Sequence, residues 1–166
     1  VLVIWLSARL VKMSMTGATL LFILYSALMG VTMSSIFMVY TTASIASVFF
    51  ITAGTFLVMS LIGYFTRIDL TRIGSILVMA LIGLIIASVV NIFLGNEVLY
   101  WVISYVGVLV FVGLTAYDTQ KIKQMVAEYG SVDEMGHKLA LFGALSLYLD
   151  FVNLFLYLLR IFGDRR

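Results

Sequence analysis

The chain has 166 residues, of which 63% are hydrophobic and 11% are charged, whereas soluble globular domains are about half apolar and about a quarter charged. This composition excludes a soluble globular domain and makes lipid the expected partner. The absence of cysteine excludes disulfides and thiolate metal sites, and the single histidine, His137, excludes multi-histidine metal clusters. The net charge of +2 is too small to indicate a nucleic-acid surface. No cofactor is expected.

Long uncharged intervals predict membrane spans. Residues 1–6 are apolar but too short to cross, so we expect them to end an upstream span and interpret the sequence as an N-terminally truncated fragment. A spanning helix needs about 20 mostly apolar residues, and continuous apolar runs favour helices over the alternating strands of a membrane barrel. The expected fold is all-α, a polytopic membrane helix bundle in one integral-membrane domain over 1–166, with five full helices at 16–37, 44–65, 73–94, 98–117 and 139–159.

Small residues predict where these helices pack. Ser26, Gly30 and Ser34 recur every four positions in the first full span, and Gly83 and Ala87 do so in the third. Such spacing lets helix backbones approach closely in lipid.

The basic residues predict the orientation of the bundle. If every segment crosses, one side of the membrane receives all the Lys and Arg of the connections, and the other side receives only Glu97 beside Tyr100 and Trp101. The positive-inside rule makes the basic side cytoplasmic. The basic connecting residues are Arg9, Lys12, Arg67, Arg72, Lys121, Lys123 and Lys138.

The C-terminus departs from this bias. If the last segment crosses fully, Arg160, Arg165 and Arg166 lie on the outer side. Either the tail is an exception to the rule, or the last segment is re-entrant and returns to the cytoplasm. Asp150 near its midpoint and Asn153 make this segment the least lipid-like of the five, as in a helix buried among others.

Two aspartates are the candidate functional groups. Asp118 is predicted at the cytoplasmic end of its span, and Asp150 lies about 16 Å along its helix from Leu139, near the middle of the bilayer. A lone aspartate there costs roughly 2.5 to 3.5 kcal/mol on insertion scales, and such groups generally face a cavity, a partner or an ion path.

The two aspartates are expected to meet if their helices pack side by side. Two carboxyls in contact cannot both ionise freely, so the pair would share a proton near neutral pH and act as a pH sensor. Carboxylates with nearby hydroxyls and carbonyls also suit Ca²⁺, for which protons would compete. Asp118 and Asp150 are therefore the candidate Ca²⁺ and proton sites, and Arg9 is a candidate ion-pair partner for Asp118.

Several segments resemble the Bax inhibitor-1 family, also called the transmembrane Bax inhibitor motif family. The most specific is FVGLTAYDTQKIK at residues 111–123, and ALSLYLDFVNLF at 144–155 adds to it. Residues 6–9, 24–37 and 159–163 are similar to the family as well, the last of these to bacterial members. The resemblance therefore implies an integral protein of a bacterial inner membrane. The resemblance covers essentially the whole chain.

The resemblance implies a fold of seven helices, of which this fragment would hold the last five and the end of the second. It also implies a pH-sensitive Ca²⁺ leak in which an aspartate pair on the last two helices controls opening, at positions matching Asp118 and Asp150. A basic residue from the second helix would latch one aspartate, and Arg9 is the candidate here. The expected function is therefore a non-enzymatic ion leak.

Two alternatives remain open at this stage. The chain is interpreted alternatively as a membrane interaction protein that modulates a partner such as a membrane-bound protease, through the hairpin 125–138 or the basic tail. An aspartyl intramembrane protease would also use two aspartates on adjacent helices. The flanking residues argue against it, because only Tyr117-Asp118 resembles the motifs of that class.

Overall fold

The expected all-helical fold is confirmed in a computed structural model, which describes residues 13–129 and 134–166. Within this part of the chain, five helical segments are long and apolar enough to cross a membrane. The first of them is interrupted by a break at Ser34 and Ser35. The helices are α2 (Met15–Met33), α3 (Ile36–Val39), α4 (Thr42–Phe65), α5 (Thr71–Leu94), α6 (Glu97–Tyr129) and α7 (Glu134–Phe162).

The helix ends follow local sequence signals. Ser14 and Thr41 accept hydrogen bonds from backbone N–H groups three residues later and so cap α2 and α4. Gly95 ends α5 in the left-handed conformation, with a φ of 59°, which glycine adopts without strain. Asn96 then accepts a hydrogen bond from the Leu99 N–H at the start of α6. The α5–α6 turn is therefore short and well defined.

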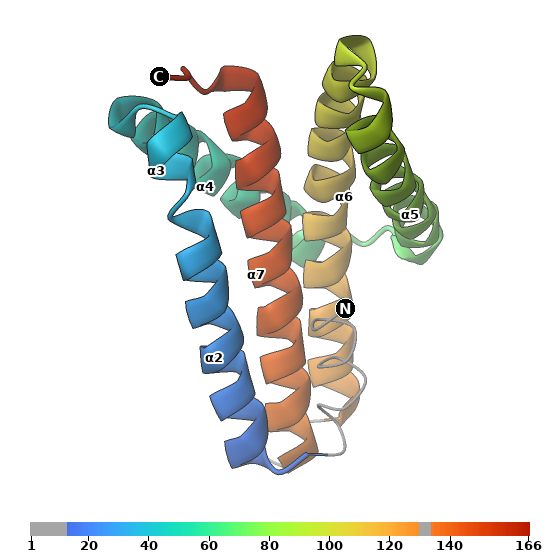
Figure 1. The fold of residues 1–166 in the computed structure, drawn as a ribbon. Coiled ribbons are helices and arrows are strands. Elements are labelled where there is room, and N and C mark those ends of the chain that lie inside the picture. The colour runs from blue at the N-terminus through green and yellow to red at the C-terminus, as the bar shows by residue number, and fades with distance from the viewer. Residues whose placement is uncertain (1–12, 130–133) are drawn as a thin grey trace.

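α6 and α7 form the centre of the bundle. They pack most extensively against each other, α4 packs on both, α5 packs on α6 and α2 packs on α7 (Figure 1). The main core lies between α4, α6 and α7, around Val48, Phe111, Leu154 and Leu159. Large apolar side chains of α5 point outward, including Phe93. An apolar outer surface is what a lipid environment requires.

α6 is longer than the sequence predicted. The predicted span ended at residue 117, but the helix continues to Tyr129 and has 33 residues, about 50 Å of helix. Residues after Tyr117 are mostly good helix formers, the chain contains no proline, and Ile122 packs against Gly143 of α7. Asp118 therefore lies inside a continuous helix and not at its end.

α7 is one continuous helix of 29 residues that is long and apolar enough to cross a membrane, which favours the crossing alternative over the re-entrant one. The C-terminal tail lies beside the α5–α6 turn and the α3–α4 connection, at the upper end of Figure 1. Three hydrogen bonds fix it there: Thr41 N–H to the Asp164 carbonyl, Asp164 N–H to Ser44 Oγ, and Arg166 N–H to the Val39 carbonyl. The tail arginines thus lie at the expected outer end.

The small-residue prediction was wrong for two of its glycines. Neither Gly30 nor Gly83 has a neighbour within 4 Å of the position that a Cβ would take. The close helix approaches occur elsewhere, at Gly63 against the Ala116 backbone and at Gly143 against Ile122. Spacing alone did not distinguish a face that meets another helix from one that meets lipid.

Candidate functional site

Asp118 and Asp150 meet between α6 and α7. Asp150 is 5% exposed, near the middle of α7, and Asp118 is half-buried on α6. Their carboxyl groups lie within range of hydrogen bonding and of each other's charge. Two carboxyls can form such a bond only if one carries a proton. The contact expected from the sequence is therefore present.

The pair lies in a cavity of about 520 Å³. Side chains from four helices line this cavity, and about half of them are apolar. Lys121, one turn after Asp118, adds a positive charge nearby, and its ammonium lies 5.9 Å from the centre of the Tyr117 ring. The polar groups that line the cavity beside the pair are Tyr25, Tyr117, Lys121, Ser146, Asn153 and Tyr157.

Asp150 has an unusual buried oxygen. Its Oδ2 is inaccessible and receives no hydrogen bond from any donor among the described residues. The amide of Asn153, one turn away, instead donates to the Leu149 carbonyl. Buried polar atoms are nearly always paired, because an unpaired one costs about 1–3 kcal/mol. An unpaired oxygen at such a buried position favours a carboxyl group that holds a proton.

The cavity brings together few side-chain ligands for a metal ion among the described residues. Ca²⁺ takes six to eight oxygen ligands, but in the part of the chain that the structure describes no three His, Cys, Asp or Glu side chains converge. The Ser146 hydroxyl and the Asn153 amide line the same cavity as the two carboxyls. The oxygen donors that face this cavity are therefore those of Asp118, Ser146, Asp150 and Asn153, with the tyrosine hydroxyls.

The third predicted site residue, Arg9, lies outside the described residues. Its proposed ion pair with Asp118 stays a prediction. Part of the hairpin 125–138, the contact region of the alternative hypothesis, lies outside them as well.

A family comparison covers the whole chain. The family described as "Inhibitor of apoptosis-promoting Bax1" matches residues 1–166. The chain belongs to the Bax inhibitor-1 family. The resemblance found in the sequence motifs is thereby confirmed.

Bacterial members of the Bax inhibitor-1 family are similar over most of their length. "Inner membrane protein YbhL" of Escherichia coli K12 is 58% identical over 166 residues, which cover 99% of this chain and 71% of that protein. An uncharacterized protein of Borreliella burgdorferi is 54% identical over 165 residues, with the same coverage. The protein RP147 of Rickettsia prowazekii is 50% identical over 155 residues, 93% of this chain and 65% of its own length. The expected inner-membrane location agrees with the name of the first relative.

This Bax inhibitor-1 domain has a second polar contact that the sequence did not predict. The contact lies on the face of α6 opposite to Asp118. Gln120 is 7% exposed and binds the α4–α5 connection at two points. Its Oε1 accepts from the Leu70 N–H at 2.9 Å, and its Nε2 donates to the Ile68 carbonyl at 2.8 Å. Lys123 donates to the Tyr64 carbonyl at the end of α4. The sequence shows a glutamine two residues after Asp118, but it does not indicate what this glutamine binds, because its partners are about 50 residues away in the chain.

Proposed function

We propose that this chain is a pH-sensitive Ca²⁺ leak of the Bax inhibitor-1 type in the bacterial inner membrane, gated by Asp118 and Asp150. The observation that carries the proposal is the contact between two buried carboxyls from the two central helices, inside a cavity. Family membership supports it but does not specify the ion. The proposed activity is transport and involves no covalent chemistry.

The gate follows from proton sharing. While the pair holds its proton, the two carboxyls are bonded to each other and carry little charge for a cation. When the proton leaves, two negative charges in a site of low dielectric repel each other. The repulsion is relieved by a cation in the cavity, by a basic partner such as Arg9, or by movement of α7 relative to α6. Each of these links cation passage to pH.

The test is Ca²⁺ flux into liposomes that contain the full-length protein, measured from pH 5 to pH 8. The wild type should show a flux that changes with pH over this range. Asp150→Asn, and Asp118→Asn combined with it, should remove the dependence, because an amide cannot exchange the shared proton. Glu128→Gln is the matched control, since Glu128 is an exposed carboxylate on the same helix as Asp118 and lies outside the cavity.

Two results would overturn the proposal. An unchanged pH profile in the double variant would show that the aspartates do not gate the flux. A wild type that passes no Ca²⁺ at any pH would remove the leak itself and favour the alternative, a membrane protein that acts by binding a partner.

A further inference from the structure

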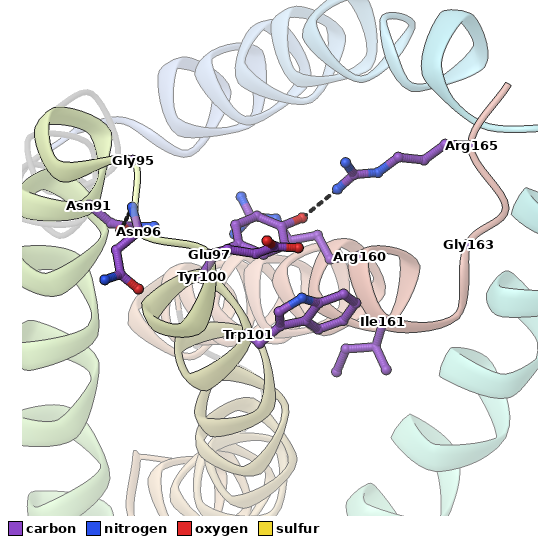
Figure 2. A pocket seen from close by; sticks show the side chains of 10 residues that line it. All are labelled: Asn91, Gly95, Asn96, Glu97, Tyr100, Trp101, Arg160, Ile161, Gly163 and Arg165. Carbon is purple, nitrogen blue, oxygen red and sulfur yellow. Dashed lines mark hydrogen bonds between the residues drawn. The ribbon is translucent and has the colours of Figure 1, made fainter.

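The outer end of the bundle holds a second polar cavity, of about 580 Å³, far from the aspartate pair. It lies between the α5–α6 turn and the end of α7, and Figure 2 shows the side chains that line it. Arg160 and Arg165 enter from the C-terminal end, and Glu97, Tyr100 and Trp101 from the start of α6.

Two guanidinium groups converge on one tyrosine in this cavity. The Cζ atoms of Arg160 and Arg165 lie 5.7 and 5.8 Å from the centre of the Tyr100 ring. Arg165 also donates from Nη2 to the Tyr100 hydroxyl at 2.8 Å, the dashed line in Figure 2. Arg160 contacts the Tyr157 ring as well, at 5.2 Å. Aromatic faces thus hold both arginines in place.

Arg160 and Arg165 have no anionic partner among the residues that the structure describes. Over residues 13–129 and 134–166, neither guanidinium forms a salt bridge, although Glu97 lines the same cavity. A hydrogen bond with Tyr40, together with the electrostatic effect and hydrogen bond of Tyr100, raises the pKa of Arg165 above its ordinary value. The cavity therefore carries two positive charges against one negative charge.

We propose that this cavity binds the phosphate of an anionic phospholipid headgroup from the outer leaflet, held by Arg160 and Arg165. Guanidinium groups present paired N–H donors that match phosphate oxygens. Tyrosine and tryptophan are the residues that line headgroup regions of membranes. The ligand also gives a reason for basic residues at the end of the bundle where the positive-inside rule does not expect them.

A second, adjoining cavity favours a lipid over a free phosphate ion. It has a volume of about 330 Å³ and shares Asn91, Tyr100 and Arg160 with the first. Its other walls include Ile92, which is 78% exposed, and the buried Ile103. A charged hollow that continues beside two isoleucines, one of them exposed on the outside of the bundle, fits a molecule with a phosphate and a hydrocarbon part.

The test uses the fluorescence of Trp101. The 166 residues contain two tryptophans, so Trp5→Phe, with any tryptophan outside these residues also replaced by phenylalanine, leaves Trp101 as the reporter beside the cavity. The full-length Trp5→Phe protein is placed in bilayers of acyl-brominated phosphatidylcholine, which quenches tryptophan. Unbrominated phosphatidylglycerol or phosphatidylcholine is then added. Recovery of fluorescence measures how well each lipid displaces the quencher.

We expect phosphatidylglycerol to displace the quencher about fivefold better than phosphatidylcholine for each arginine that contacts it. Arg160→Gln should reduce this preference about fivefold. Glu97→Gln should increase it, because it removes the negative charge from the cavity. Arg166→Gln is the matched control, since Arg166 is an exposed arginine at the same end that does not line the cavity, and it should leave the preference unchanged.

Three outcomes would overturn the inference. The first is the absence of any preference for phosphatidylglycerol. The second is an equal loss in Arg160→Gln and Arg166→Gln, which would indicate general surface charge. The third is an equal fluorescence response to free glycerol phosphate in detergent micelles, which would make the ligand a soluble anion. Mass spectrometry of phospholipid retained by purified wild type and Arg160→Gln gives a second measurement that needs no tryptophan substitution, and we expect the variant to retain less anionic phospholipid than the wild type.

Discussion

Gln120 shows how one buried amide positions a whole connection between helices. It pairs with an N–H and a carbonyl of the segment between α4 and α5, neither of which belongs to a helical hydrogen-bond ladder. The segment is thereby held against α6 two residues from Asp118. The amide contributes to the shape of the site without touching it.

Gln120→Ala should therefore destabilise the fold. The substitution leaves the Leu70 N–H and the Ile68 carbonyl without their partner, which costs about 1–3 kcal/mol where no water replaces it. Thermal unfolding in detergent measures the effect. Gln124→Ala is the control, because Gln124 is exposed one turn further along α6, and its unfolding temperature should stay close to that of the wild type. Equal unfolding temperatures for the two variants would contradict the role assigned to Gln120.

Asp69 lies in the same connection, and the hydrogen bonds to its carboxylate predict that the stability of the fold depends on pH. The hydroxyl and then the backbone N–H of Thr71 donate to its carboxylate and lower the pKa of Asp69 below its ordinary value. A group with a lowered pKa stabilises the folded state above its unfolded pKa of about 3.9. That stabilisation is lost as the pH falls through the folded pKa.

Asp69→Ala should therefore lower the unfolding temperature at pH 7, and the difference from the wild type should shrink as the pH falls below 4. The effect should be small, since Asp69 is fully exposed to solvent. Unfolding scans in detergent at several pH values measure it. A difference between the two proteins that stays constant down to pH 2 would show that the lost contact is independent of ionisation.

At the scale of elements, α4 and α6 approach closely at Gly63. The position that a Cβ would take there coincides with the backbone of Ala116, which no side-chain rotation can relieve. Gly63→Ala should separate the two helices next to the aspartate pair and destabilise the protein by about 1–3 kcal/mol. Thermal unfolding in detergent is again the measurement.

Gly54→Ala on the same helix is the matched control. Gly54 has no neighbour within 4 Å of its Cβ position, so alanine there should be neutral or should stabilise α4 by up to about 1 kcal/mol. The two variants make the same chemical change on one helix and should shift the unfolding temperature in opposite directions. A similar loss in both would mean that the effect is one of helix content and not of contact with α6.

At the scale of the whole molecule, the sequence predicted the membrane helices because each is a long uncharged run. It placed the end of α6 wrongly, since the charged residues after Tyr117 resemble a connection although they continue the helix. It also predicted that Asp118 and Asp150 would meet, because adjacent helices in a bundle pack side by side. The positions of Gly63 and Gln120 depend on contacts with distant segments, and no local pattern predicts them.

The attachment of the C-terminal tail has a mechanical consequence. The tail is tied to the α3–α4 connection, so α7 is anchored close to Phe162. Asp150 lies about 18 Å from that end and the start of α7 about 42 Å from it. If α7 tilts as a rigid rod about its anchored end, a displacement at Asp150 is more than doubled at the opposite end. Separation of the two carboxyls would then be transmitted as a larger movement at the expected cytoplasmic surface, as by a lever about a fixed pivot.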